Sequence, residues 1–370
     1  MRTVRLGQSN LHVSRVGLGT MGLGGYFQRD DSRDAEVVRV LQRAMDAGAN
    51  LIDTAEIYGA GHAETLVGRA IGGRRSQVVI ATKFSPERSG YRGVVEAAEQ
   101  SLVRLQTDVI DLYQTHWPNP QHLFEETIRA LQALLVAGKI RTVGLSNATQ
   151  QQMRLARAAF APEVFVALQQ QYNLADRHVE TAHLPFCREQ GCTLLAYSPL
   201  LEGKLAPADT RRTELDRLAR GAGLTPGQLI LAWLLRHPEV VVIPKAGSAQ
   251  HLDANLAAAE IQLSPDLIMA VDQLYLQQTV MVEPSEIEIA DAANRQVCKT
   301  VDEARANVTG MSPSPLEVAE ELQRGENFKP IKVRRTNGEG KPYQLTEGRL
   351  RYWAWVLAFG QEKSVPCFLV

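Results

Sequence analysis

Eight short apolar segments alternate with eight charged segments of helical periodicity through most of this 370-residue chain. Continuous apolar strands that alternate with amphipathic helices are typical of a parallel sheet covered on both faces. Eight such units over about 260 residues predict an α/β protein built as a (β/α)8 barrel, also called a TIM barrel. The expected strands are residues 16–19, 50–53, 78–81, 109–113, 142–145, 164–168, 193–197 and 240–243. The expected helices are residues 33–47, 62–72, 91–105, 123–137, 149–159, 180–190, 226–236 and 250–259.

The two ends of the chain do not follow this alternation. Residues 1–14 hold two short alternating stretches around a Gly-Gln-Ser-Asn turn, which predict a β-hairpin. We expect a barrel domain over residues 1–277, a linker over residues 278–284 and a small α+β domain over residues 285–370. The expected elements of the small domain are strands 286–289, 330–334, 342–345 and 365–370, helices 315–323 and 349–359, and a turn at 337–340.

The composition limits the classes of function. Lys and Arg number 40 against 41 Asp and Glu, and this balance argues against a strongly basic nucleic-acid-binding surface. No apolar run approaches the ~18–20 residues that span a membrane, and the first residues lack an apolar stretch of signal-peptide length. The cysteines have no metal-binding spacing, so we expect no metal site, reduced thiols and a cytoplasmic protein. They are Cys187, Cys192, Cys298 and Cys367.

Residues 17–22 match the Gly-x-Gly-x-x-Gly fingerprint of dinucleotide-binding folds. In those folds a helix begins directly at the glycines. Here more glycine, Tyr26, Phe27 and a stretch rich in Arg and Asp come before the first expected helix. A glycine-rich loop after the first barrel strand is therefore favoured over a doubly wound sheet.

Polar side chains stand at the ends of three consecutive expected strands. Asp53 ends the second strand, and Tyr58 lies in the loop that follows it. Lys83 comes just after the third strand, and His116 just after the fourth. Active residues of a (β/α)8 barrel gather at the C-terminal ends of its strands, so we expect these four side chains to meet.

Such a group of side chains suits the reduction of a carbonyl. Hydride delivery to the carbonyl carbon builds negative charge on the oxygen, which then needs a proton and hydrogen-bond donors. A phenol with a pKa of about 10 is a weak acid at neutral pH unless a cation stabilises the phenolate. We expect Tyr58 to give the proton and Lys83 to lower its pKa. Asp53 would hold Lys83, and His116 would orient the carbonyl. Each residue also has a structural alternative, because an aspartate at a strand end often caps a helix and a lone histidine is usually structural.

Residues 1 to about 276 resemble the aldo-keto reductase family. The resemblance rests on ordered motifs at residues 53–59, 81–83, 116–119, 144–147, 169 with 172–174, 196–200 and 243–245. It implies a (β/α)8 barrel that binds NADP(H) without a Rossmann domain. It also implies that Asp53, Tyr58, Lys83 and His116 are the catalytic tetrad, with Tyr58 as the acid in reduction and the base in oxidation.

The same resemblance implies a cofactor site formed by the loops after several strands. Its implied members are Gly19, Thr20, Met21, Asp53, Ser146, Asn147, Gln169, Tyr197, Ser198, Pro199, Leu200, Gly203, Ile243, Lys245, Ser248, His251 and Asn255. Among them, Ser146, Asn147 and Gln169 would hold the nicotinamide carboxamide. Tyr197 would stack on the nicotinamide ring.

The phosphate-binding part of this implied site lies in two loops. Ser198, Leu200 and Gly203 would line the pyrophosphate, where backbone N–H groups suit an anion. Lys245 and Ser248 stand where the family binds the adenosine 2′-phosphate, and Asn255 stands where it contacts adenine. His251 replaces an arginine found there in many members, and a neutral imidazole is a weaker phosphate ligand than a guanidinium. We therefore expect NADP(H) to be preferred and NAD(H) to be usable.

The C-terminal region resembles the ParB/sulfiredoxin fold. The segments that carry this resemblance are residues 328–333, 343–354 and 365–367. In that family a Gly-Arg segment opens a helix and binds nucleotide phosphates, so Gly348, Arg349 and Arg351 are candidates for binding an anion such as ATP or CTP. The sulfiredoxin cysteine and the helix-turn-helix of partition proteins have no counterpart in this sequence, so neither activity is expected.

Several alternatives stay open at this point. The C-terminal region could be a packing or dimerising module, with a core of aromatic residues from one helix: Tyr352, Trp353, Trp355 and Phe359. It could also be a nucleotide-dependent kinase or hydrolase with Glu286 or Glu288 as a base. For the barrel, the alternative is a regulatory protein that senses NADP(H), although a sensor has no need of an intact tetrad.

Contacts with the substrate are expected from two aromatic loop residues, Tyr26 and Trp117. Packing within the loops is the alternative for both. The partner implied by the tetrad is a small carbonyl compound or alcohol. The sequence does not specify which compound this is, nor the oligomeric state.

Overall fold

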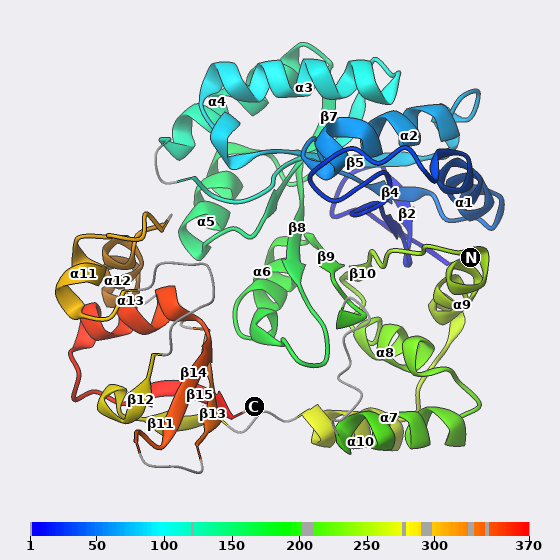
Figure 1. Cartoon of the computed structure of the whole chain (residues 1–370). Helices are drawn as coiled ribbons and strands as arrows, with labels where there is room; N and C mark the ends of the chain where they lie inside the picture. The colour runs from blue at the N-terminus through cyan, green and yellow to red at the C-terminus, as the bar shows by residue number, and fades with distance from the viewer. Residues whose placement is uncertain are drawn as a thin grey trace. The chain divides into compact units, whose positions relative to one another are not determined.

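The computed structural model describes residues 2–119, 122–201, 210–275, 279–289, 298–311, 313–324, 329–336 and 340–369. Its internal contacts divide the chain into two compact units, Met1–Tyr275 and Leu276–Val370. In Figure 1 the first unit runs from blue to yellow along the chain, and the second runs from yellow to red. Among the described residues, no helix combines the length and the apolar character needed to cross a membrane.

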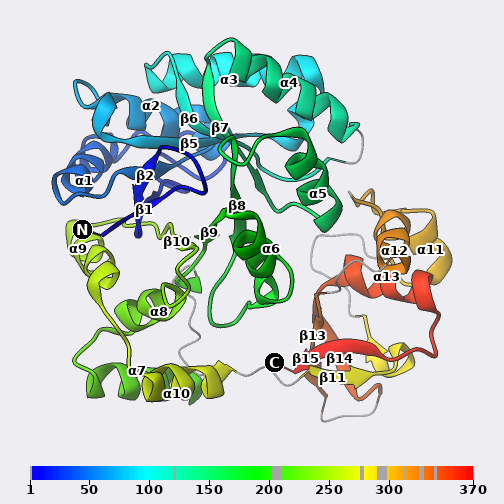
Figure 2. The ribbon, with the colours of Figure 1, turned by 180° about the vertical axis from the view of Figure 1, so that it is seen from behind.

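The first unit is a closed barrel of eight parallel strands that follow one another in sequence order (Figures 1 and 2). The strands are β3 (Leu18–Gly19), β4 (Leu51–Asp53), β5 (Val79–Phe84), β6 (Ile110–Thr115), β7 (Ile140–Ser146), β8 (Phe165–Gln171), β9 (Thr193–Tyr197) and β10 (Val240–Val242). The sheet closes because Gly17 N donates to the Val242 carbonyl at 2.9 Å, and Val242 N donates to the Arg15 carbonyl at 3.1 Å. The predicted (β/α)8 barrel is therefore confirmed.

Helices follow the strands on the outside of the barrel (Figure 1). They are α1 (Asp34–Asp46), α2 (His62–Ala70), α3 (Tyr91–Leu105), α4 (Phe124–Val136), α5 (Gln150–Ala159), α6 (His183–Gln190), α7 (Thr210–Gly221), α8 (Pro226–Leu234), α9 (Ala249–Ala257) and α10 (Pro265–Tyr275). Thr149 and Thr225 each form a reciprocal capping box, which defines where α5 and α8 begin. The helices α7 and α10 are additions to the eight that the sequence predicts.

The glycine-rich residues 17–22 lead into a loop, since α1 begins only at Asp34. This arrangement agrees with the expected barrel loop, and the closed sheet excludes a doubly wound fold. The predicted N-terminal hairpin is present as β1 (Thr3–Arg5) and β2 (His12–Ser14). Leu6 and Val13 of the hairpin region pack in one apolar cluster with strand residues such as Leu51, Val79 and Leu112.

The second unit contains one five-stranded sheet and three helices among its described residues. Its elements are β11 (Thr279–Val282), β12 (Ile287–Glu288), α11 (Val301–Arg305), α12 (Pro315–Gln323), β13 (Ile331–Arg335), β14 (Tyr343–Glu347), α13 (Arg349–Phe359) and β15 (Val365–Leu369). The strand order is β11-β15-β13-β14-β12, with a mixture of parallel and antiparallel pairs. Of the expected turn at 337–340, only Gly340 lies within the described residues.

Most of the stretch expected to be a linker, residues 278–284, belongs to the sheet of the second unit. Residues 279–282 form β11, which pairs antiparallel with β15. Val280 and Val282 lie against the apolar core of this unit. The sequence did not predict strand β11 because its partner, β15, lies at the far end of the chain. Local sequence patterns do not reveal such a distant pairing.

The core of the second unit is built around α13. Tyr352, Trp353 and Trp355 are buried there, and Phe359 packs against them. This agrees with the interpretation of these aromatic residues as core. Glu286 and Glu288, the candidate bases of the kinase or hydrolase alternative, are exposed to solvent.

Candidate active site

Four side chains of the barrel unit meet where β4, β5 and β6 end. Asp53 is the last residue of β4, Lys83 is the penultimate residue of β5, and His116 directly follows β6. Tyr58 opens a short 3-10 turn, Tyr58–Gly61, between β4 and α2. All four residues are buried, and the most exposed of them, Tyr58, is only 6% accessible.

Lys83 and Asp53 form a buried ion pair. Lys83 Nζ donates to Asp53 Oδ2 at 2.7 Å and to the Thr54 carbonyl at 2.8 Å. Gln169 Nε2 donates to the other carboxylate oxygen at 2.7 Å. Burial is the largest single influence on Lys83 and lowers its pKa, but the Asp53 carboxylate and the Tyr58 hydroxyl together more than offset this effect, so the pKa is raised. Lys83 is therefore a fixed cation in the barrel.

Tyr58 lies between this cation and His116. Lys83 Nζ is 5.3 Å from the centroid of the Tyr58 ring. The Tyr58 hydroxyl oxygen is 3.4 Å from His116 Nε2, and the two rings meet edge to face. The structure thus brings together all four residues that the sequence analysis selected.

The pKa shifts in this group define its protonation states. Burial raises the pKa of Tyr58 above its ordinary value, and the positive charge of Lys83 offsets only part of that rise. The net direction is opposite to the one expected from the sequence, because burial outweighs the cation. Burial and Lys83 together lower the pKa of His116 to about 2. At neutral pH the site therefore holds a protonated phenol, a neutral imidazole and an ammonium ion.

The residues expected to hold a nicotinamide are joined to these four by hydrogen bonds. Asn147 Nδ2 donates to the His116 carbonyl at 2.9 Å and to Ser146 Oγ at 3.1 Å. Tyr197 donates from its hydroxyl to Asn147 Oδ1 at 2.8 Å. Asn147 itself has a φ of 54°, a left-handed conformation that asparagine adopts more readily than most residues. Together with the bond from Gln169 to Asp53, these contacts form one network at the ends of β7, β8 and β9.

Gly19, Thr20 and Met21 bring the end of β3 next to the loop after β10. A Cβ at Gly19 would lie 2.7 Å from the Ile243 carbonyl oxygen, so only glycine fits there. Thr20 N donates to the Asp53 carbonyl at 2.9 Å. The Thr20 hydroxyl is buried and has no hydrogen-bond partner among the residues that the structure describes. A buried hydroxyl left in this way fits a site that receives a polar ligand.

The loop after β9 begins with a left-handed residue. Ser198 has a φ of 46°, and its carbonyl accepts a hydrogen bond from Asn173 Nδ2 at 3.2 Å. Pro199 is buried and Leu200 packs against the barrel core. Gly203, the remaining predicted pyrophosphate contact, lies outside the described residues.

The residues expected at the adenosine end lie in the loop after β10 and in α9. Ser248 caps α9, and its hydroxyl accepts a hydrogen bond from His251 N at 3.3 Å. Asn255 is buried in the same helix, whereas Lys245 and His251 are exposed. The Lys245 ammonium lies 5.4 Å from the centroid of the Tyr26 ring. One predicted substrate residue therefore contacts a predicted phosphate ligand.

The two predicted substrate residues differ in their surroundings. Trp117 stacks on His116 with ring centroids 3.9 Å apart, so it adjoins the group of four buried side chains. Tyr26 is 57% exposed, and its carbonyl accepts a hydrogen bond from Gly59 N at 2.7 Å. Both residues are sufficiently exposed to contact a ligand.

In the expected anion site of the second unit, the Arg351 guanidinium is already bonded within the protein. Gly348 has a φ of 99° and precedes α13, and Arg349 begins that helix. Arg351 Nη1 donates to the carbonyls of Lys329 and Pro330, both at 2.8 Å. This guanidinium therefore holds the backbone before β13.

Two contributors to the site had no role in the sequence analysis. The Thr54 carbonyl accepts a hydrogen bond from Lys83, and Asn173 supports the backbone at Ser198. Asn173 belongs to one of the motifs that define the resemblance, but the sequence analysis gave it no role. The Thr54 contact involves only backbone on its side, and no side-chain pattern signals it.

Comparison with known proteins identifies the barrel. The sequence pattern of the Aldo/keto reductase family matches residues 15–276. Methylglyoxal reductase YeaE of Escherichia coli is 34% identical over 262 residues, which are 70% of this chain and 92% of that protein.

Solved structures give the same result. The thermostable aldo-keto reductase Tm1743, solved with the inhibitor epalrestat, is 40% identical with a TM-score of 0.70 and matches 74% of this chain and all of that one. An aldo/keto reductase from Klebsiella pneumoniae, in complex with NADP and acetate, is 38% identical with a TM-score of 0.68, over 74% of this chain and 95% of that one. The chain therefore belongs to the aldo/keto reductase family and is an oxidoreductase.

Proposed function

We propose that this protein uses NADP(H) to reduce an aldehyde or ketone to an alcohol, or to catalyse the reverse reaction, with Tyr58 as general acid and base. The observation that carries the proposal is the buried Lys83–Asp53 pair beside the Tyr58 phenol and the neutral His116 imidazole. Structures of relatives with NADP and NADPH support the choice of cofactor.

Each side chain of the group has a definite task in this proposal. Tyr58 keeps its proton at neutral pH and can donate it as charge develops on the carbonyl oxygen. The fixed charge of Lys83 then stabilises the resulting phenolate. His116, neutral and next to the Tyr58 hydroxyl, can donate a second hydrogen bond to the same oxygen. Asp53 orients Lys83 and keeps it charged.

The residues present fit NADP(H). Thr20 lies next to Asp53, and its buried hydroxyl has no hydrogen-bond partner among the described residues, so it is available to a polar ligand. When bound, the nicotinamide supplies the hydride that the carbonyl carbon receives. Asn147, Ser146 and Gln169 would hold its carboxamide. Lys245 would bind the 2′-phosphate, while His251 in place of arginine leaves NAD(H) as a usable second cofactor.

The first test is Tyr58→Phe, assayed with NADPH and a panel of small aldehydes and ketones that includes methylglyoxal, because one relative carries that name. Loss of the general acid is expected to reduce kcat/KM by about 10²–10⁴-fold. Tyr113→Phe is the matched control, because Tyr113 is also buried but its hydroxyl donates to the Val94 carbonyl away from the site. Full turnover by Tyr58→Phe with every reducible compound would refute the mechanism. Binding of NADPH without turnover in the unmodified protein would favour the regulatory alternative.

For the second unit, the ParB/sulfiredoxin-like fold and an ATP or CTP site at the start of α13 are also proposals. The left-handed Gly348 before Arg349 supports them, whereas the bonds of Arg351 to backbone carbonyls support a packing role. Calorimetry of the full chain with ATP and CTP tests the site. Heat of binding that disappears in Arg349→Ala supports it, and no heat with either nucleotide refutes it.

The setting of the protein is a proposal as well. All four cysteines are free and buried, which suits a reducing compartment such as the cytoplasm.

A further inference from the structure

The turn that presents Tyr58 has an unusual backbone. Three consecutive residues after Tyr58 are left-handed, with φ of 57° at Gly59, 53° at Ala60 and 89° at Gly61. Glycine adopts this conformation freely, but Ala60 does so at a cost because of its Cβ. Such a turn persists only where surrounding contacts hold it.

The contacts that hold this turn come from the first barrel loop, between β3 and α1, and from the first residue of α1. Gly59 N donates to the Tyr26 carbonyl at 2.7 Å, and a Cβ at Gly59 would lie only 2.3 Å from the Gly24 carbonyl oxygen. His62, the residue directly after the turn, provides the second attachment, with Nε2 2.7 Å from Asp34 Oδ1. The loop and the turn are therefore fastened on both sides of Ala60.

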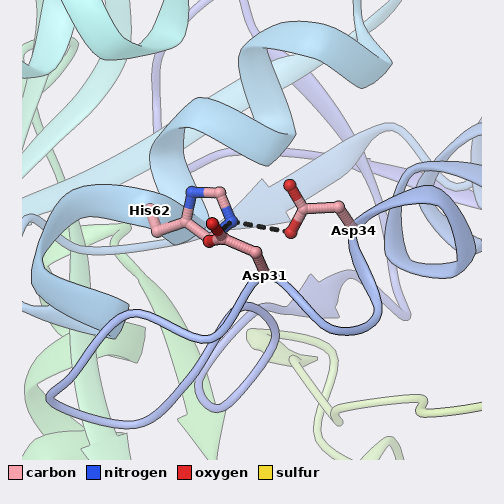
Figure 3. Close-up of side chains that lie close together, drawn as sticks. All are labelled: Asp31, Asp34 and His62. Carbon is pink, nitrogen blue, oxygen red and sulfur yellow. Dashed lines mark hydrogen bonds and ion pairs between the residues drawn. The ribbon is translucent and has the colours of Figure 1, made fainter.

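Figure 3 shows the His62 imidazole directed at Asp31 and Asp34. The imidazole is almost fully buried, with 1% of the side chain exposed, and Nε2 is 3.3 Å from Asp31 Oδ1. An ionised carboxylate can only accept, so Nε2 carries the hydrogen and donates it. His62 thus links the start of α2 to the start of α1.

The same three side chains have donor atoms within 4.8 Å of one another, as a metal site would require. Their charges argue for a different role. Arg29 pairs with Asp31 at 2.5 Å, and Arg69 pairs with Asp34 at 2.9 Å. A divalent cation would have to displace both guanidinium groups from carboxylates that they already neutralise. The cluster is therefore better explained as a hydrogen-bonded ion-pair network.

We infer that His62 and Asp34 are positioning residues for Tyr58: they hold the left-handed turn against the first barrel loop. This inference rests on the proposed function, because it concerns the geometry of the proposed general acid. Neither residue touches the four reactive side chains through any contact that the structure records. Their effect runs through the backbone of the turn, where a small displacement of the Tyr58 hydroxyl lowers the rate of proton transfer.

The test compares His62→Leu, His62→Gln and Asp34→Asn with the unmodified protein. The control is Asp46→Asn, because Asp46 pairs with Arg74 at 2.5 Å at the opposite end of the same helix α1. Activity is measured per NADPH-binding site well below the unfolding temperature, with NADPH and with NADPH deuterated at the transferred position.

His62→Leu is expected to lower kcat about tenfold while KM for NADPH stays within about twofold, as displacement of a catalytic group predicts. The isotope effect on kcat should increase, since chemistry becomes slower than the other steps. His62→Gln keeps a side-chain N–H donor and should recover most of the rate. Asp34→Asn should lie between them, and Asp46→Asn should match the unmodified protein.

The inference is overturned if kcat in His62→Leu is unchanged. It is also overturned if total activity falls only in proportion to the loss of NADPH-binding sites. Zinc binding to the unmodified protein that is absent in His62→Leu and changes kcat would overturn it in favour of a metal site. A fully active Tyr58→Phe would instead refute the proposed function itself. A normal His62→Leu beside an inactive Tyr58→Phe would refute only the positioning role.

Discussion

The buried ion pair of the barrel and the buried aromatic residues of the second unit use their polar groups in opposite ways. In the barrel, Lys83 and Asp53 pair beneath a phenol, and the Thr20 hydroxyl has no hydrogen-bond partner among the described residues. In the second unit, the polar atoms of the buried aromatic residues donate to nearby backbone. Trp353 Nε1 donates to the Cys298 carbonyl at 3.1 Å, and Trp355 Nε1 donates to the Lys363 carbonyl at 3.0 Å.

This difference shows where each unit has chemistry to offer. A buried donor that bonds to its own backbone stabilises the fold but has nothing left for a ligand. A buried charge or hydroxyl at the end of a barrel strand has a stability cost, and a reaction at that place explains why it is kept. The comparison favours a catalytic barrel and a second unit whose described core serves packing.

The largest effect is expected from Lys83→Met in the barrel. It leaves the Asp53 carboxylate buried without its cation, so unfolding should require about 3–5 kcal/mol less free energy, and turnover should fall by at least about 10²-fold. Lys332→Met in the second unit breaks a partly exposed pair with Glu347 and should cost less than about 1 kcal/mol. Denaturant unfolding and steady-state assays measure both. Equal losses in the two variants would remove the contrast between the units.

The next effect concerns the core of the second unit. Trp353→Ala removes a buried indole and its bond to the Cys298 carbonyl, and should destabilise that unit by about 3–5 kcal/mol. Because the barrel has its own apolar core, NADPH-dependent turnover should persist. Calorimetric scanning with parallel activity assays would detect this. A simultaneous loss of turnover would show that the two units do not act independently.

A smaller effect follows from pH. His116 has a pKa of about 2 when folded and an ordinary value of 6.5, so the unfolded chain binds the proton first as pH falls. Its contribution to stability is complete above about pH 6.5 and declines toward pH 2, by about 1 kcal/mol between pH 6 and pH 5. His116→Gln should remove this part of the acid sensitivity. Residues 276–370 contain no histidine, so unfolding of the second unit should show no pH dependence from histidine protonation. The test is to measure the free energy of unfolding as a function of pH. An unchanged pH dependence in His116→Gln would contradict the prediction.

The smallest effect is expected at Ala60. Glycine adopts the left-handed conformation without steric cost, so Ala60→Gly should raise stability by up to about 1 kcal/mol, or leave it unchanged if the gain in unfolded-state entropy cancels the benefit. Ala133→Gly within helix α4 should lower stability by about 1 kcal/mol. Thermal unfolding of the two variants gives the comparison. Destabilisation by Ala60→Gly as large as that by Ala133→Gly would show that the turn is not strained.

Local sequence patterns determined most of the architecture. The helices α3 and α13 agree with the expected bounds residue for residue, because the glycines at their ends, Gly90 before α3 and Gly348 and Gly360 on either side of α13, are local signals. The strand alternation predicted the barrel, and the barrel in turn placed Asp53, Lys83 and His116 at one end of the strands.

Other features were decided only by the tertiary structure. The strand β11 forms because β15 from the far end of the chain pairs with it, and no local pattern contains that partner. The pKa of Tyr58 rises because burial in the folded barrel outweighs the nearby Lys83 charge. The attachment of the Tyr58 turn through His62 likewise depends on two helices that meet only after folding. Pairing, burial and such contacts join residues distant in sequence, so only the folded chain determines them.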